Sequence, residues 1–151
     1  MTPPLVIGYG NSLRQDDGVG WRAAELLKER LNGIEADILR CRQLTPELVE
    51  KLESPRMAIF LDASIDRPFH SVTLTSIRPK PETGGFSHHL TPERLMDLAQ
   101  AMYGHAPPGF VVTAGLKDFG FSERLTEDGE VCAARMADLA FQMLVAIPQH
   151  V

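Results

Sequence analysis

The sequence predicts a single α/β domain over residues 1–151, with a twisted, mostly parallel sheet of about five strands and helices on both faces, in three layers. Three observations support this fold class. Short apolar runs alternate with segments of helical periodicity along almost the whole chain. The length of 151 residues is that of one ordinary domain. No repeat, low-complexity tract or linker divides the sequence into two parts.

Five segments have the composition of strands. The first stops at Gly8, and the clearest is apolar throughout until it reaches Asp62. The fourth alternates between apolar and polar residues, as a strand at the edge of a sheet does. The expected strands are residues 5–7, 36–40, 57–62, 71–77 and 110–114.

Two helices are expected in the first third of the chain. A helical pattern begins at Gly18 and ends at Asn32-Gly33, because these residues readily adopt the left-handed conformation that closes a helix. A second, short helix is expected with Thr45 as its cap and Pro46 at its first position. The apolar residues expected to point inward are Val19, Ala23, Leu26, Leu27 and Leu31 in the first helix and Leu48 and Leu52 in the second.

Two further helices are expected in the second half. One opens at Thr91 and Pro92 and ends near Gly104, and a long one follows a loop that runs to about Asp128. Cys132 lies in this last helix among apolar neighbours, so we interpret it as a packing residue and not as a nucleophile. The expected apolar stripes are Leu95, Leu98, Ala99 and Met102 in the first of these helices and Ala137, Ala140, Phe141 and Leu144 in the second.

Composition excludes several classes of protein. The chain is 44% hydrophobic and 23% charged, as ordinary globular proteins are. Its formal net charge is −5 and it has no basic stripe, which argues against a nucleic acid or an anionic membrane as partner. No apolar run approaches the ~20 residues of a membrane helix, and no signal peptide is evident. With two distant cysteines and no CxxC, we expect a cytoplasmic protein with reduced thiols.

The glycine-rich segment 8–20 follows the first strand, at the sheet edge where parallel α/β proteins bind ligands. It departs from the dinucleotide-binding pattern GxGxxG, because Leu13 occupies the third glycine position. Two adjacent acids also precede the next helix, and they would repel a pyrophosphate docked there. We therefore expect no organic cofactor at this position.

Those two acids are Asp16 and Asp17. Their structural interpretation is capping of the following helix and a favourable interaction with its dipole. One acid suffices for a cap, so the other is available to face a ligand. By its position, Asp17 is the better candidate for that second role.

A carboxylate and two histidines complete the set of candidate site residues. Asp62 ends the most apolar strand, where it pairs with a neighbouring arginine or belongs to a metal or catalytic site. His88 and His89 precede a helix, where the structural interpretation is a hydrogen-bonding or capping role. An imidazole together with two carboxylates suits zinc, nickel or iron and leaves coordination positions open.

These motifs resemble the hydrogenase maturation proteases, endopeptidases that remove a C-terminal extension from the large subunit of nickel–iron hydrogenases. The resemblance is most specific in the glycine-rich segment with its acid pair, and it covers most of the chain. The matching positions are 8–11, 13, 16–20, 62, 87–95, 103–104, 106–108 and 110–113.

The resemblance implies a metal-binding cleft formed by Asp17, Asp62 and a histidine. His88 is the preferred histidine because the apolar residues that follow it have the expected spacing, and His89 is the alternative. The metal implied is nickel already inserted in the substrate protein, so that the partner is the precursor of a hydrogenase large subunit. We expect the protein itself to be a monomer.

Two groups are candidates for activating the water that attacks the peptide bond. The metal lowers the pKa of the attacking water, or one of the acids, Asp16 or Asp17, acts as a general base in the manner of an aspartyl protease. A different class of function uses the same ligands. It is a nickel-binding chaperone or assembly factor without peptidase activity, which would bind the free ion tightly.

Overall fold

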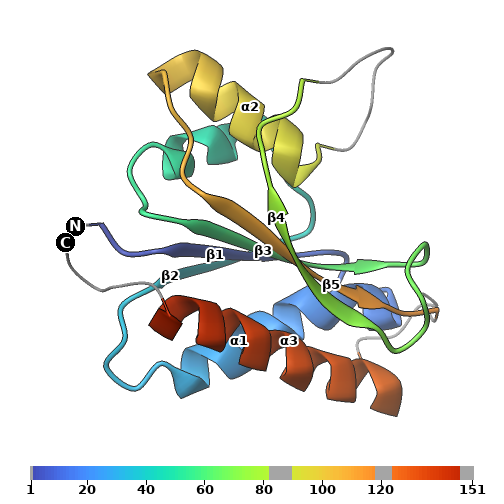
Figure 1. Ribbon diagram of the computed structural model, residues 1–151. Helices are drawn as coiled ribbons and strands as arrows, with labels where there is room; N and C mark the ends of the chain where they lie inside the picture. Colours follow the sequence, from blue (N-terminus) through green and yellow to red (C-terminus); the bar gives the residue numbers. More distant parts are fainter. Residues whose placement is uncertain (1, 82–89, 118–123, 147–151) are drawn as a thin grey trace.

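The computed structural model describes residues 2–81, 90–117 and 124–146, and its centre is a five-stranded sheet in the order β2-β1-β3-β5-β4 (Figure 1). Neighbouring strands run parallel except at β4, which is antiparallel to β5. The α/β class, the mostly parallel sheet and the edge position of the fourth strand are thereby confirmed. The strands are β1 Leu5–Tyr9, β2 Asp37–Cys41, β3 Ala58–Ser64, β4 Val72–Ile77 and β5 Gly109–Gly115.

Helices cover both faces of this sheet (Figure 1). The long helices α1 (Val19–Arg30) and α3 (Glu127–Ala146) pack against one face and against each other. On the other face lie α2 (Pro92–Tyr103) and the 3₁₀ helix η2 (Pro46–Leu52), which contact each other. None of the helices in the described ranges is long and apolar enough to cross a membrane.

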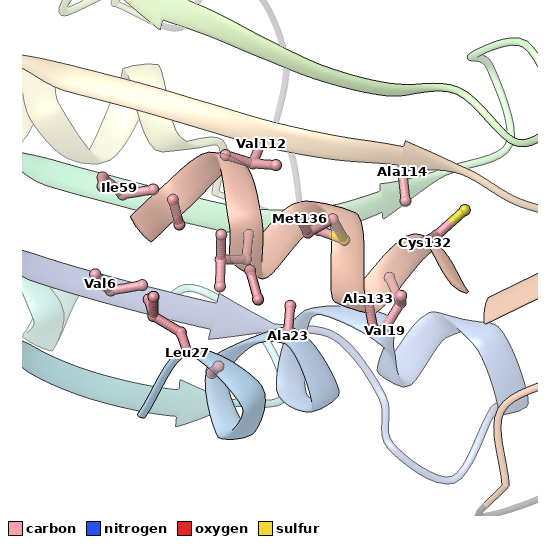
Figure 2. Close-up of a cluster of buried hydrophobic side chains, with 14 of the residues drawn as sticks. Val6, Val19, Ala23, Leu27, Ile59, Val112, Ala114, Cys132, Ala133 and Met136 are labelled. Carbon is pink, nitrogen blue, oxygen red and sulfur yellow. The ribbon is translucent and has the colours of Figure 1, made fainter. Parts of the chain in front are cut away.

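Each face of the sheet has its own apolar core, because side chains alternate along each strand. In β3, Ile59 and Leu61 point toward α1 and α3, whereas Ala58 and Phe60 point toward α2 and η2. Figure 2 shows the first core, in which Cys132 is fully buried. Burial raises the pKa of the Cys132 thiol, so its assignment as an unreactive packing residue agrees with its surroundings.

Helix α2 begins and ends as its sequence predicts. The Thr91 hydroxyl accepts a hydrogen bond of 3.1 Å from the N–H of Arg94, and Pro92 occupies the first turn. Gly104 closes the helix in the left-handed conformation, with φ of 80°. The predicted stripe is wrong at one position, since Met102 is 64% exposed and Met96 is buried in its place.

The short helix η2 differs from its prediction in two details. Thr45 stands at the capping position with an extended backbone, but its side chain makes no capping hydrogen bond. Val49 and Leu52 are the buried residues, whereas Leu48 is half-buried. The cause of the second difference is that η2 is a 3₁₀ helix with about three residues per turn, so positions three apart share a face.

Candidate active site

A cleft of about 580 Å³ lies at the carboxyl ends of β1 and β3. This is the edge of a parallel sheet where ligands bind in α/β proteins. Asp17 and Asp62 both line it, although they come from different elements and are far apart in sequence. The remaining lining residues are Tyr9, Gly10, Asn11, Arg14, Arg42, Gln43, Leu44, Ala63 and Leu90.

Asp62 is held from one side only. Its Oδ2 accepts a hydrogen bond of 2.7 Å from the Tyr9 hydroxyl. Its Oδ1 is buried and has no hydrogen-bond partner among the residues that the structure describes. An unpartnered buried carboxylate oxygen is costly, so this atom is suited to meet a cation or a donor that arrives with the substrate.

Burial raises the pKa of the Asp62 carboxyl above its ordinary value, and hydrogen bonding from Tyr9 opposes this rise. The side chain of Thr113, which lies beside Asp62 in the β3–β5 register, also favours the charged form. The pKa of Tyr9 lies well above its ordinary value because the phenol is buried beside the Asp62 carboxylate.

Asp17 is held by the glycine-rich loop itself. Its Oδ2 accepts a hydrogen bond of 2.8 Å from the N–H of Asn11, and its own N–H donates to the carbonyl of Arg14 at 3.0 Å. A Cβ at Gly10, where φ is 144°, would lie 2.1 Å from the Asp17 carbonyl oxygen. Glycine is therefore required at position 10 for the loop to fold back over Asp17.

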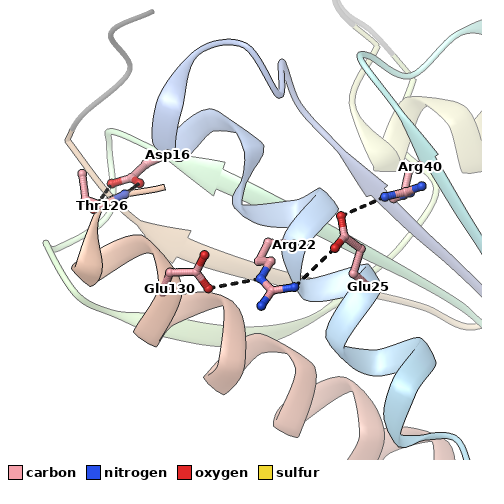
Figure 3. Close-up of polar contacts among 6 residues, drawn as sticks. All are labelled: Asp16, Arg22, Glu25, Arg40, Thr126 and Glu130. Carbon is pink, nitrogen blue, oxygen red and sulfur yellow. Dashed lines mark hydrogen bonds and ion pairs between the residues drawn. The ribbon is translucent and has the colours of Figure 1, made fainter. Parts of the chain in front are cut away.

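Asp16 points away from the cleft, into the contact between the loop and α3 (Figure 3). It is fully buried, and it accepts hydrogen bonds from the N–H of Thr126 at 2.9 Å and from the Thr126 hydroxyl at 2.7 Å. Neither acid caps α1, whose N-cap is Gly18 with no side-chain bond. The expected cap is therefore wrong, because a 3₁₀ turn, η1 (Gln15–Gly18), carries both acids away from the first turn of α1.

His88 and His89 lie outside the described residues, so the structure does not place them. Leu90, directly after them, lines the cleft. Among the described residues no group of three or more acidic, histidine or cysteine side chains is arranged to hold a metal ion. Among the described residues, the cleft thus offers two carboxylates, Asp17 and Asp62, as possible metal ligands.

Sequence reasoning missed Tyr9 as a site residue. The signal that could have found it is the alternation of side chains along β1 and β3, which places Tyr9 and Asp62 on the α2 face of adjacent strands. The glycines of the motif also have a packing role. A Cβ at Gly20 would lie 2.4 Å from the Leu61 carbonyl oxygen, so α1 approaches the sheet closely beside the cleft.

No protein-family model matches the sequence, and no curated protein matches it. Among solved structures, the chain is similar to a [NiFe] hydrogenase maturation protease, HycI, from Thermococcus kodakarensis KOD1. The TM-score is 0.76 at 23% identity, over 95% of this chain and 93% of that chain.

The hydrogenase maturating endopeptidase HybD from E. coli has a TM-score of 0.78 at 19% identity, over 96% of this chain and 93% of that chain. A hydrogenase 2 maturation peptidase from a Thaumarchaeota archaeon has a TM-score of 0.69 at 21% identity, over 97% and 100% of the two chains. The chain therefore shares, over nearly its whole length, the fold of the hydrogenase maturation proteases of known structure.

Proposed function

We propose that this protein is an endopeptidase that removes the C-terminal extension of a nickel–iron hydrogenase large-subunit precursor after nickel insertion. The observation that carries the proposal is the meeting of Asp17 and Asp62 in one cleft, in a fold shared with the maturation proteases. We expect the protein to act as a monomer in the cytoplasm, where such a precursor would be its partner.

In this proposal Asp17, Asp62 and either His88 or His89 recognise nickel that the precursor already carries. The unpartnered Oδ1 of Asp62 is the described atom best suited to contact that ion. Two carboxylates and one imidazole form an incomplete ligand set, which holds a free ion weakly but completes the coordination of an ion held by another protein. Nickel would thus act as a checkpoint, because a precursor without it lacks this contact.

The cleft also favours one of the two acids as a general base. Hydrolysis adds water to the carbonyl carbon of the scissile peptide bond, breaks the C–N bond and delivers a proton to the leaving amine. Asp17 lines the cleft and uses one oxygen for Asn11, so when Asp62 and the histidine contact the nickel, the other oxygen of Asp17 is left to accept a proton from water. Both oxygens of Asp16 already accept hydrogen bonds from Thr126, away from the cleft. Asp17 is therefore our candidate base.

The test is a cleavage assay read by mass spectrometry. The protein is mixed with the large-subunit precursor of each hydrogenase from the same organism, with and without nickel loaded. The expected result is loss of a short C-terminal peptide from the loaded precursor only. No cleavage of any loaded precursor, together with tight stoichiometric binding of free nickel, would instead establish the chaperone function.

Variants of the two cleft acids test the site. Asp62→Asn and Asp17→Asn should each lower the rate of cleavage by about a hundredfold or more, because acid–base and charge effects of this kind contribute that much. Asp66→Asn is the matched control, since Asp66 is an exposed acid beyond the end of β3 that does not line the cleft. Normal cleavage by a folded Asp62→Asn protein would show that the site is wrong.

A further inference from the structure

Strand β2 forms one edge of the sheet, and its outer side has no partner strand among the described residues. Its odd-numbered residues face β1: the N–H of Asp37 donates to the Pro4 carbonyl at 2.8 Å, and the Cys41 carbonyl accepts from Gly10 at 3.1 Å. In a parallel pair the backbone groups of successive residues point to opposite sides. The N–H and C=O groups of Ile38 and Arg40 therefore point outward and are open to pairing.

A groove of about 560 Å³ lies at the amino-terminal end of this edge, where residues that precede β1, β2 and β3 also line it. Lys28 and Leu31 line it from the α1 side and Lys51 lines it from the η2 side, so it opens between the two helical layers. Ile38 and Leu39 of β2 also line it. The groove thus gives an extended chain access to the outer side of β2 at Ile38, from which the edge continues to Arg40 and to the carboxyl end of the strand.

The long charged side chain of Arg40, of a kind that can block an edge strand, is drawn toward α1. The guanidinium of Arg40 contacts Glu25 of α1 at 2.9 Å (Figure 3). It also lies over the ring of Trp21, 5.2 Å from the ring centroid. Trp21 in turn donates a hydrogen bond to the Cys41 carbonyl. These contacts hold the Arg40 side chain against α1, and Arg40 is an exposed residue.

The open edge leads directly into the candidate cleft. Strand β2 ends at Cys41, and the next three residues, 42–44, line the cleft with Asp17 and Asp62. We propose that an extended segment of the substrate polypeptide adds to the outer edge of β2 as a further strand, and that this pairing delivers its scissile bond to the cleft. The inference rests on the proposed peptidase function and names how its substrate is held.

The chemistry of the edge selects a polypeptide as occupant. Outward N–H and C=O groups two residues apart match the repeat of an extended chain, which is how β-strand addition gives affinity through main-chain bonds. The groove carries two basic side chains, Lys28 and Lys51, and two acidic ones, Asp37 and Glu50, so its charges balance and it has no net preference for a substrate side chain of either sign. An endopeptidase must also hold its substrate extended, because a folded backbone keeps the scissile carbonyl from the catalytic groups.

The first test separates the backbone of Arg40 from its side chain. Arg40→Pro removes the outward N–H without touching a bond to β1, and proline is tolerated at such edge positions. Arg40→Ala is the matched control, because it removes the same side-chain contacts and keeps the N–H. For cleavage of the nickel-loaded precursor, we expect the KM of Arg40→Pro to exceed that of Arg40→Ala by about tenfold, with kcat changed by less than about threefold.

The second test uses amide hydrogen exchange and needs no substitution in β2. The full chain carrying Asp62→Asn, which leaves the substrate uncleaved, is mixed with the nickel-loaded precursor. We expect exchange at the Ile38 and Arg40 amides to slow by about tenfold or more. The Leu39 amide, which faces β1, should be unaffected.

Absence of protection at both amides overturns the inference, whether or not the precursor is cleaved. Equal KM values for the two Arg40 variants with cleavage intact overturn it as well and leave the proposed function standing. Protection that depends on protein concentration without precursor would show that the edge pairs with a second copy, which also overturns it. Failure of the wild-type chain to cleave any loaded precursor counts against the proposed function itself.

Discussion

At the scale of single residues, the site depends on how one carboxylate is held. Asp62 follows the four buried residues of β3, two residues before the strand ends, and its charge is tolerated there because Tyr9 donates a hydrogen bond to one oxygen. The other oxygen has no partner in the described part of the chain. Such a carboxylate is fixed in direction but not fully satisfied, which suits a group that must bind an incoming substrate.

Replacing Tyr9 by Phe should weaken both the site and the fold. The change leaves Asp62 Oδ2 without its donor, and we expect the free energy of unfolding to fall by about 1–3 kcal/mol. The rate of precursor cleavage should fall by about tenfold, because the carboxylate is no longer held in one direction. Denaturant unfolding and the mass-spectrometric assay measure the two effects.

Tyr103→Phe provides the matched control for this prediction. Tyr103 is the second of the two tyrosines, and it does not line the cleft. Equal unfolding free energies and cleavage rates for the two variants would contradict a role for the Tyr9 hydroxyl.

The raised pKa of Asp62 predicts how stability depends on pH. Below about pH 4, the ordinary pKa of aspartate, the carboxyl is neutral in both the folded and the unfolded chain. As the pH rises through the higher folded-state pKa, the buried charge forms and stability is lost. The difference in unfolding free energy between Asp62→Asn and wild type should therefore shift in favour of the variant as the pH rises from about 4 toward neutrality.

Denaturant titrations of both proteins across this range measure that shift. Replacing the carboxyl group by an amide also has an effect of its own on stability, but this effect is the same at every pH and does not contribute to the shift. A difference that stays constant, or that moves in favour of the wild type, would show that Asp62 does not titrate with a raised pKa in the folded protein.

At the scale of elements, close packing of α1 on the sheet sets the shape of the cleft. A Cβ at Gly8 would lie 2.3 Å from the Gly20 carbonyl oxygen, and a Cβ at Gly20 would meet the backbone of both Leu61 and Tyr9. These glycines let the helix approach β1 and β3 at the point where they carry Tyr9 and Asp62. The glycine motif therefore builds the edge of the site through packing.

Substituting Gly20 by Ala tests this packing. The sign of the change in unfolding free energy shows whether helix propensity or the close contact dominates. Helix propensity alone would stabilise the protein by up to about 1 kcal/mol. Because the new Cβ would lie 2.4 Å from a backbone oxygen, we expect instead a loss of about 1–3 kcal/mol in the free energy of unfolding. Thermal or denaturant unfolding measures it, and a stabilised variant would refute the close approach.

At the scale of the whole molecule, a buried polar contact joins the glycine-rich loop near the start of the chain to the segment before α3. Asp16, in the loop that carries Asp17, binds both the N–H and the hydroxyl of Thr126 just before α3 (Figure 3). The Thr126 hydroxyl also accepts from the N–H of Gly129 at 3.0 Å. By contrast, the ion pairs of Arg22 with Glu25 and Glu130 are exposed and contribute little.

Removing the Thr126 hydroxyl should therefore be costly. Thr126→Val leaves one oxygen of the buried Asp16 carboxylate without a donor, and we expect a loss of about 1–3 kcal/mol in unfolding free energy. Thr126→Ser keeps the hydroxyl and should lose less than about 1 kcal/mol, only the cost of one methyl group. Equal losses in the two variants would show that the hydroxyl bond does not stabilise the protein.

The sequence alone determined the layered α/β architecture, all five strands and the edge position of β4, because the period of apolar residues reports which faces are buried. It also brought Asp17 and Asp62 to one edge, since the carboxyl ends of neighbouring parallel strands meet there.

Only the tertiary structure decided that Asp16 turns away toward Thr126, that Tyr9 holds Asp62, and that β2 is an edge strand with no outer partner strand in the described part of the chain. The physical reason is that these features join residues far apart in the chain. Local spacing records which side of an element a residue occupies, but the partner it meets is fixed only when the elements pack.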